Sequence, residues 1–525
     1  MSKQATEEHA TAAQKPDAEI ATLALSANTL APLADRLPVP RYDRKNLCAG
    51  VVHVGVGAFH RAHQAMYHDR LLNQEPKRWL GWGICGVGLL PGDRRMKEAL
   101  DAQDGLYTLV EKDAGGGCSA RVIGSIKRYL LAPSNPEPVI EAMADERVRI
   151  ISLTITEGGY NVDPDSGEFD ADDADVARDL APDAAPRTVF GVVTEALDRR
   201  RARRLRPFTV MSCDNLPGNG ERSRLAFTSF ARLRDPSLGE WIDSQVAFPN
   251  SMVDRITPAT TAEDRDEVRS RFGIEDRWPV VCESFAEWVL EDSFSAGRPA
   301  YDRAGVRLVA DVGPYELMKL RLVNAGHQAL AYFGYLCGYR FVHEAAQDPD
   351  LRAFLLGYLD EEGVPTLPSV PGVDLRDYTR TLIERFANAS VPDTLARVCA
   401  YGSDRIPTFL LPVIRAQLAG STEVRRSAAV IAAWARYAQG IDEEGQPIEV
   451  VDRFSDTLTE TARRQRDDPD AFLAQRQWFG DLADEPRFAT AFRSSLRSLH
   501  ERGARATVRA LIETPDAAAT MGAPR

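Results

Sequence analysis

The sequence predicts an α/β protein in which a Rossmann-type parallel sheet domain is followed by a mostly α-helical C-terminal domain. Over roughly the first 300 residues, short apolar segments alternate with helical ones, which is typical of a parallel sheet covered on both faces. After about residue 305 the apolar residues recur at helical spacing and strand signals become few. The 525 residues are also too many for one ordinary core, so two large domains are expected.

These observations divide the chain into three segments. We expect an N-terminal extension at 1–44, partly disordered up to about residue 20, a dinucleotide-binding domain at 45–305 and a helical substrate and catalytic domain at 306–525. The N-terminus lacks the apolar core of a secretory signal, and no window reaches the roughly 18 apolar residues of a membrane span. The seven cysteines are scattered without a CxxC pair, which suits reduced thiols and a cytoplasmic location.

Charge narrows the class of partner. The net charge is −13 and the pI about 5.3, whereas nucleic acids and anionic membranes need a basic face. The basic run at 199–206 is interpreted as a solvated helix end. We therefore expect a small-molecule ligand, no nucleic acid and no membrane partner. The oligomeric state stays open, a monomer included.

The elements of the first domain follow in order. Four apolar runs are predicted as strands, at 51–57, 82–90, 147–156 and 207–215. Between them lie predicted helices, at 60–72, 138–146 and 188–202. In the second domain the predicted helices cover 316–336, 351–363, 375–389, 425–440 and 492–513.

The first strand ends in a glycine turn, HVGVGAFHRAH at 53–63. Glycines at a strand-to-helix turn let a dinucleotide pyrophosphate approach the backbone and the N–H groups of the helix. The expected cofactor contacts here are Gly55, Gly57, Phe59 and Arg61. His60 replaces the third glycine of the usual fingerprint, so a simple tight turn remains an alternative.

An acidic residue is expected after the second strand to bind the adenosine ribose. Asp93, in PGDRR, is the candidate. It lies further from the glycines than the usual spacing of about 20 residues, so the first crossover must be long. The acid favours NAD as cofactor, while the two arginines that follow it leave NADP open.

Four of the eight histidines, His53, His60, His63 and His68, lie close together in the sequence. An HxxH pair on a helix can bind zinc if a third ligand is supplied. No cysteine stands at a recognisable spacing, so capping and packing are the alternative and no metal is expected.

A polar face on an otherwise apolar helix is the most informative feature. At about 100° per residue, Glu316, Lys319, Asn324 and His327 fall on one face of ELMKLRLVNAGHQALA. The face is either an exposed stripe or a buried cluster that must be hydrogen-bonded or functional. Asn215 follows the fourth strand, where an open parallel sheet binds its ligands.

The chain resembles the polyol-specific long-chain dehydrogenases, the mannitol dehydrogenase family. The resemblance runs in order through HVGVGAFHRAH, SLTITEGGY, SCDNLPGNG, FPNSMVDRITP and K-x4-N-x2-H. It covers nearly the whole chain from about residue 45, with looser matches at ERFANASV and YGSDRIP. ICGVGLLPGDRR, WPVVCESFAEWVLED and GYRFVHE are most similar to the mannitol 2-dehydrogenase branch; fructuronate reductases and arabinitol dehydrogenases are near neighbours.

The resemblance implies a zinc-independent, NAD(P)-dependent enzyme whose helical domain encloses the active site. Lys319 matches the catalytic lysine, and Asn324 and His327 match its partners on the same helix. Asn215 matches an asparagine that holds the substrate oxygen, and Glu316 an acid implicated in proton exit. Asp254 and Arg397 match substrate-contacting positions.

The expected reaction is NAD-dependent oxidation of a polyol to a ketose and its reverse, with D-mannitol and D-fructose favoured. A fructuronate reductase or a D-arabinitol dehydrogenase is the alternative within the family. Lysine can act as the base only when burial keeps it neutral, and the apolar helix provides that setting. A zinc-dependent dehydrogenase and a catalytically silent NAD-sensing protein are the two hypotheses from other classes.

Overall fold

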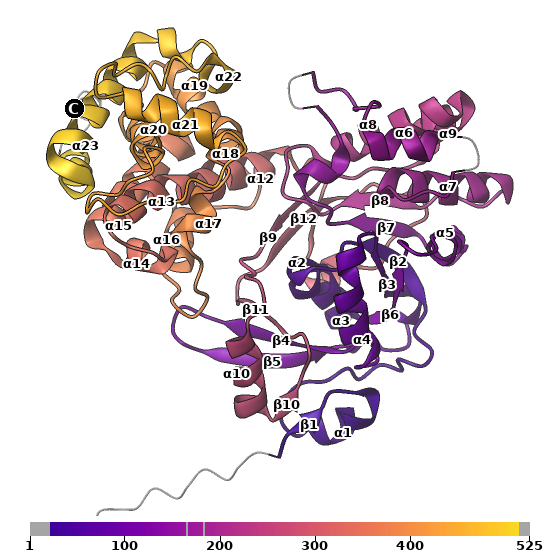
Figure 1. The fold of residues 1–525 in the computed structure, drawn as a ribbon. Helices are drawn as coiled ribbons and strands as arrows, with labels where there is room; N and C mark the ends of the chain where they lie inside the picture. Colours follow the sequence, from indigo (N-terminus) through magenta and orange to yellow (C-terminus); the bar gives the residue numbers. More distant parts are fainter. Residues whose placement is uncertain (1–20, 164–165, 182–183, 514–525) are drawn as a thin grey trace, which may run out of the picture.

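The computed structural model describes residues 21–163, 166–181 and 184–513. It has a sheet-containing N-terminal domain and a helical C-terminal domain (Figure 1), which confirms the predicted fold class. The segment up to residue 20, predicted to be disordered, lies outside the described residues.

The main sheet has five parallel strands in the order β6-β3-β2-β7-β8. They are β2 (Ala49–Val54), β3 (Gly83–Gly88), β6 (Ile126–Leu131), β7 (Ile150–Leu153) and β8 (Thr209–Ser212). Four were predicted and β6 was not. The chain order reverses between β2 and β7, and such a switch point is where open α/β sheets bind nucleotides.

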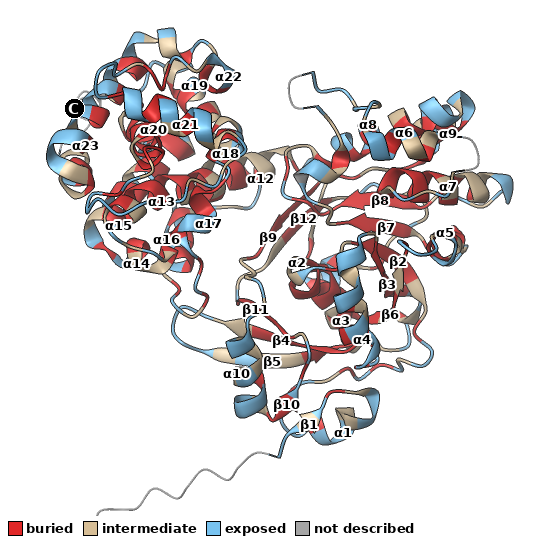
Figure 2. Cartoon of the chain, viewed as in Figure 1, coloured by how far each residue is buried: buried red, intermediate tan, exposed pale blue. Residues whose placement is uncertain are grey.

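Helices cover both faces of this sheet because successive residues of a strand point to opposite sides. The side chains of Val51 and Ile150 lie in the hydrophobic core on one face of the sheet. Those of Val52 and Ile151 lie in the core on the other face. The first face is covered by α3 (Gln64–Gln74) and α4 (Arg94–Asp101). The second is covered by α5 (Glu137–Ala144), α7 (Val189–Ala202), α8 (Asn219–Arg234) and α9 (Pro236–Gln245). Figure 2 shows the central strands buried between these layers.

The single helix predicted for 60–72 is wrong. The chain forms α2 (Ala58–Ala62) and then α3, and His63 between them has non-helical backbone angles, φ −119° and ψ −92°. The His63 side chain bonds to the Glu287 carbonyl, with Nε2 and O 2.9 Å apart. This tertiary contact holds the break in place.

Three smaller sheets were missed by the sequence analysis. They have the orders β1-β10, β11-β4-β5 and β13-β12-β9. The strands are β1 (Leu23–Ala24), β4 (Tyr107–Lys112), β5 (Cys118–Ile123), β9 (Ser251–Asp254), β10 (Ile274–Glu275), β11 (Val280–Glu283), β12 (Glu287–Glu291) and β13 (Arg307–Val309). The remaining helices of the domain are α1 (Leu30–Leu33), α6 (Ala174–Leu180), α10 (Ala262–Phe272) and α11 (Tyr301–Ala304).

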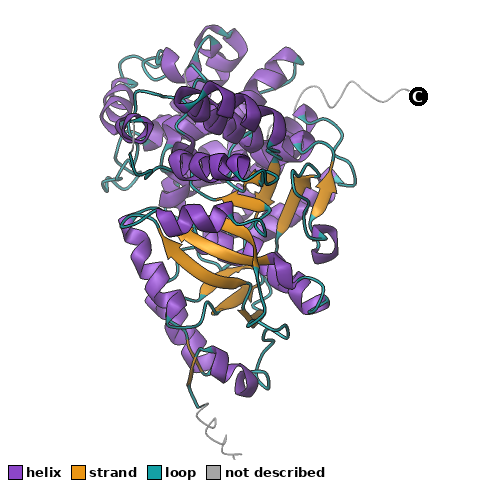
Figure 3. Ribbon diagram, turned by 90° about the vertical axis from the view of Figure 1, so that its right-hand side faces the viewer, coloured by secondary structure: helices purple, strands orange, loops and turns teal. Residues whose placement is uncertain are grey.

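The helical domain begins at Gly313, shortly after β13. Its helices are α12 (Gly313–Met318), α13 (Ala325–Leu336), α14 (Val342–Gln347), α15 (Pro349–Gly357), α16 (Leu375–Phe386), α17 (Leu395–Cys399), α18 (Gly402–Phe409), α19 (Leu411–Ala419), α20 (Arg425–Tyr437), α21 (Ser455–Arg464), α22 (Arg476–Phe479) and α23 (Pro486–Glu513). Helices α13 and α20 form its centre, where Leu330, Phe333 and Trp434 are buried. The side view shows these helices stacked above the strands (Figure 3). None of the described helices has the length and apolar character needed to cross a bilayer.

The helix with the polar face is not a regular α-helix. Helix α12 passes into a π-helical segment, Lys319–Asn324 (η5), and then into α13. The wider turn changes the angular spacing from which one continuous face was predicted. Short π segments inside α-helices occur frequently at functional sites.

Candidate active site

Lys319 reaches from the helical domain to the strand ends of the first domain. Its side chain is buried, with 7% of the residue exposed. The Nζ atom donates to Asn215 Oδ1 and to the Val253 carbonyl, each at 2.6 Å. Asn215 follows β8 and Val253 belongs to β9. The contacts thus bring together three segments that are far apart in the sequence.

Glu316 lies one turn before the lysine. Its Oε1 accepts a hydrogen bond from the Gly218 N–H at 2.9 Å. Burial raises the pKa of this carboxyl, while the bond from Gly218 acts in the opposite direction. A cavity of about 10 Å³ is lined by Asn215, Glu316 and Lys319, among others, close to the volume that one water requires.

Asn324 and His327 each have a buried side-chain nitrogen without a hydrogen-bond partner among the described residues. The two atoms are Asn324 Nδ2 and His327 Nε2. The imidazole stacks on Phe386, with ring centres 3.9 Å apart. Burial lowers the pKa of His327 to about 3, so the ring is neutral. Orphaned buried polar groups are rare, and a hydroxylated ligand would supply the missing partners.

The structure adds a residue that sequence reasoning missed. Arg385 of α16 donates from Nη1 to Asp254 Oδ2 at 2.7 Å. Its Nε and Nη2 donate to the two carboxylate oxygens of Glu283 at 2.9 and 2.8 Å. Burial would raise the pKa of Asp254, but the charge and hydrogen bond of Arg385 hold it below its ordinary value. Asp254 therefore stays ionised beside the lysine.

A signal for Arg385 was present in the sequence. It stands in LIERFA among Leu382, Ile383 and Phe386, all of which are buried. A charge in an apolar helical segment indicates a buried ion pair.

Arg397 occupies a different environment from the one expected. Its side chain is 59% exposed and pairs with Asp393, which accepts from Nε at 2.5 Å. The charges of both residues affect the pKa of His327. The structure therefore places Arg397 near the imidazole with its own charge already paired.

Three of the predicted cofactor-binding residues, Gly55, Gly57 and Asp93, follow strands β2 and β3 at the carboxyl edge of the main sheet. Gly55 has φ +92°, and a Cβ there would lie 2.0 Å from the Thr154 carbonyl, so only glycine fits. Gly57 caps α2, and a Cβ on it would meet nothing closer than 3.9 Å. Asp93 follows β3, and its Oδ2 accepts from the Leu90 N–H at 2.9 Å. Open space before a helix N-terminus, with an acid beside it, fits a pyrophosphate and a ribose.

Phe59 and Arg61 differ in their placement. Phe59 is half-buried and stacks on His63, with ring centres 4.8 Å apart. Arg61 is fully buried; it donates to the Trp278 carbonyl and lies over the Tyr107 ring. The structure does not bring the Arg61 side chain to the sheet edge with the glycines.

Three of the four clustered histidines are hydrogen-bonded to protein groups, while both buried ring nitrogens of His60 lack a partner among the described residues. His53, His63 and His68 each hydrogen-bond a neighbouring side chain or carbonyl, and His60 stacks on His53 with ring centres 3.4 Å apart. Across the described ranges, no three His, Cys, Asp or Glu side chains are grouped as a metal site. All seven cysteines lie in these ranges and are free, as predicted.

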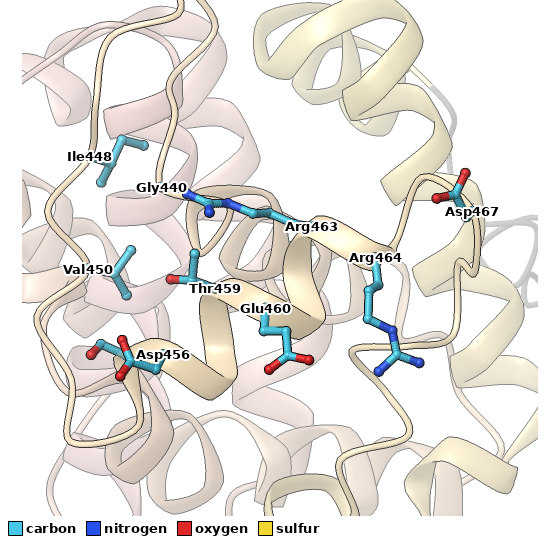
Figure 4. Close-up of a pocket in the computed structure, with 10 residues that line it drawn as sticks. Gly440, Ile448, Val450, Asp456, Thr459, Glu460, Arg463, Arg464 and Asp467 are labelled. Atoms are coloured by element: carbon cyan, nitrogen blue, oxygen red, sulfur yellow. The ribbon is translucent and has the colours of Figure 1, made fainter.

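A second hollow lies far from these residues, in the helical domain. It has a volume of about 750 Å³ and is lined by charged and polar residues of α21, by Asp467 after it, and by Gly440, Ile448 and Val450 before it (Figure 4). Its lining includes none of the predicted site residues. The candidate active site is therefore the junction between the two domains.

Comparison with known proteins identifies the family of the chain. Residues 49–303 match the mannitol dehydrogenase Rossmann domain and residues 311–500 the mannitol dehydrogenase C-terminal domain. Mannitol 2-dehydrogenase of Phaeosphaeria nodorum is 46% identical over 494 residues, 93% of this chain and 86% of that protein. Mannitol 2-dehydrogenase of Aspergillus fumigatus is 44% identical over 495 residues, which are 92% of this chain and 98% of that protein.

Two solved structures are similar over nearly their whole length. Pseudomonas fluorescens mannitol 2-dehydrogenase, in a ternary complex with NAD and D-mannitol, gives a TM-score of 0.86 at 43% identity and covers 94% of this chain and 100% of its own. A substrate-free D-sorbitol dehydrogenase gives a TM-score of 0.85 at 38% identity. The match covers 92% of this chain and 100% of that one. The chain belongs to the mannitol dehydrogenase family.

Proposed function

We propose that this protein is an NAD-dependent polyol dehydrogenase that interconverts D-mannitol and D-fructose, with Lys319 as the general base and no metal. The observation that carries the proposal is the Lys319 amine, held by Asn215 and the Val253 carbonyl beside the orphaned polar atoms of Asn324 and His327. This is an arrangement for taking a proton from one hydroxyl of a polyhydroxylated chain.

Each polar residue has a role in that step. In its neutral form the Lys319 amine accepts the hydroxyl proton, which a positioned base does with a gain of about 10²–10⁴ in rate. The Asn215 and Asn324 amide groups donate to the oxygen as its negative charge develops. His327, neutral in its buried position, orients the hydroxyls. Glu316, linked through the small cavity, takes the proton onward.

The dinucleotide edge would hold the cofactor. NAD, when bound, supplies the hydride acceptor that alcohol oxidation requires. Gly55 and Gly57 would admit the pyrophosphate at the start of α2, and Asp93 would accept from the ribose hydroxyls. The complex of the Pseudomonas enzyme with NAD and D-mannitol supports both choices of ligand.

The charges of the pocket support a neutral substrate. Arg397 is the one predicted residue that could pair with a uronate carboxylate, and Asp393 already pairs with it. Asp254 adds a negative charge that Arg385 balances. A fructuronate carboxylate would have no unpaired cation among these residues.

An activity panel tests the proposal. Purified enzyme would be assayed with NAD on D-mannitol, D-sorbitol and D-arabinitol, and with NADH on fructose and fructuronate. We expect the highest kcat/KM with D-mannitol and fructose, and activity that survives exhaustive chelation. A tenfold preference for fructuronate, or an activity that only added zinc restores, would overturn it.

A further inference from the structure

Glu287 is a half-buried residue whose carboxyl group the mechanism above does not use. It is the first residue of β12 and stands directly opposite Asp254 in the antiparallel β12–β9 pair. Residues opposite each other in such a pair project from the same face of the sheet. Glu287 therefore lies next to Asp254, a predicted substrate-binding residue. Its Oε2 is buried and has no hydrogen-bond partner in the described part of the chain.

Tyr378 presents the complementary group from another element. It lies on α16, seven residues before Arg385, and a seven-residue spacing places two side chains on one helix face. Its hydroxyl is buried and, among the described residues, also lacks a partner. Asp254 and Glu287 are among the charges that affect the pKa of Tyr378, so the three side chains share one region.

The Glu287 oxygen and the Tyr378 hydroxyl are two buried polar atoms without hydrogen-bond partners in the same region of the described structure. A buried polar group without a hydrogen bond destabilises a fold, so such groups need a functional reason. The pKa of Glu287 is raised by burial and by the Asp254 charge, while that of Asp254 is lowered. Neighbouring carboxyls held at different pKa values are characteristic of functional sites. A carboxyl oxygen accepts and a phenol can donate or accept, which together suit hydroxyl groups.

We propose that Glu287 and Tyr378 bind hydroxyl groups of the polyol chain on the Asp254 side of the pocket and so help to select a hydroxylated substrate. This assignment rests on the proposed function. It adds two substrate-binding residues to those that the sequence motifs indicate.

Substrate analogues provide the test. Glu287→Ala and Tyr378→Phe would be compared with wild-type enzyme for kcat/KM on fructose and on a series of monodeoxy fructoses. We expect each variant to lose about tenfold or more on fructose, the size of one hydrogen bond to a polar or charged group. The KM for NADH should stay within twofold. For the deoxy compound that lacks the bound hydroxyl, the variant should lose little, because the contact is already absent.

Thermal stability separates binding from structure. Because the Glu287 oxygen and the Tyr378 hydroxyl lack partners, we expect ligand-free Glu287→Gln and Tyr378→Phe to melt at or above the wild-type Tm. Glu287→Gln should retain more activity than Glu287→Ala, since an amide oxygen still accepts a hydrogen bond. Glu384→Ala is the matched control, because it removes an exposed carboxylate from α16 and should change neither measurement.

The outcomes distinguish this assignment from the proposed function. If wild-type enzyme turned over no polyol or ketose of the panel, both would be overturned. If wild-type enzyme were active but both variants kept its kcat/KM on fructose, or lost the same factor on every deoxy analogue, only the assignment of Glu287 and Tyr378 would fail.

Discussion

At the scale of single residues, the site depends on how buried polar atoms are satisfied. Lys319 has two strong acceptors at 2.6 Å, so its amine can be held in an apolar setting. Asn324 and His327 keep unpaired atoms beside it. In the proposed mechanism the protein positions the lysine base, while Asn324 and His327 keep hydrogen-bonding atoms available for the substrate.

Replacing the lysine should remove the base. We expect Lys319→Ala to lower kcat for D-mannitol oxidation by about 10²–10⁴-fold and to abolish the rise of the rate with pH that deprotonation of a base produces. NAD affinity should hardly change, because the lysine contacts the substrate side. Steady-state kinetics over a pH series would measure kcat and its pH dependence, and a fluorescence titration with NADH would measure cofactor affinity. Lys77→Ala, at an exposed site, is the control; near-normal turnover in Lys319→Ala would place the base elsewhere.

Replacing Asp93 should change cofactor preference. Asp93→Asn keeps an oxygen for the Leu90 N–H but removes the charge that would bind the ribose hydroxyls and repel a 2′-phosphate. A charge-assisted bond contributes about 1.5–3 kcal/mol, so kcat/KM for NAD should fall at least tenfold while that for NADP falls less. Asp101→Asn is the control, because it changes an exposed carboxylate of α4, the helix that follows Asp93, where Asp101 pairs with Lys97. An unchanged NAD-to-NADP ratio would show that Asp93 is not the ribose acid.

At the scale of elements, periodicity predicted the long buried segments and missed the interrupted or irregular ones. Strands β2, β3, β7 and β8 are continuous apolar runs, and the sequence located all four. Strands β9 (SMVD) and β12 (EWVLE) are no shorter than β7 and β8, but polar residues interrupt their apolar runs. They pair with each other across a remote stretch of chain, so no local pattern marks them. A regular period also cannot show the π turn at Lys319–Asn324, because it is one irregular turn between two α-helices.

A second π segment, Tyr358–Gly363, contains a buried acid whose titration should affect stability. The Glu362 carboxylate accepts from the Arg426 and Ser427 N–H groups at the start of α20, and burial raises the pKa of Glu362 to about 7. The native state therefore binds this proton more tightly than the unfolded chain does. The resulting stabilisation is present below about pH 4.5 and is lost as pH rises through about 7.

Glu362→Gln should remove this pH dependence. We expect the Tm of wild type relative to the variant to fall between about pH 5 and about pH 8, by an amount corresponding to at most about 3 kcal/mol. Calorimetry of both proteins across that range would measure the difference. Glu361→Gln, which removes the neighbouring partly exposed carboxylate, should follow the wild-type profile. A constant difference between Glu362→Gln and wild type would contradict the assignment of the titration to Glu362.

At the scale of the whole molecule, the candidate active site is assembled from residues of both domains. The first domain supplies Asn215 and Asp254, and the second supplies Lys319, His327 and Arg385. The sequence motifs identified most of these residues because each motif is local. The pairing of Arg385 with Asp254 and Glu283 joins residues more than 100 positions apart, so it required the folded structure.

The Arg385 ion pairs are expected to couple stability and activity across the junction between the domains. Arg385→Gln would leave two buried carboxylates without their cation, and breaking a buried pair typically costs about 3–5 kcal/mol, so the Tm should fall by several degrees. Burial would then raise the pKa of Asp254 unopposed by Arg385, so the acidic limb of the kcat/KM profile should move to higher pH. Arg385→Lys should have a Tm and a kcat/KM pH profile between those of Arg385→Gln and wild type. Arg380→Gln, which changes an exposed arginine of the same helix, should alter neither the Tm nor the pH profile. If Arg385→Gln lowered the Tm but kept the wild-type pH profile, Arg385 would join the domains without controlling the charge of Asp254.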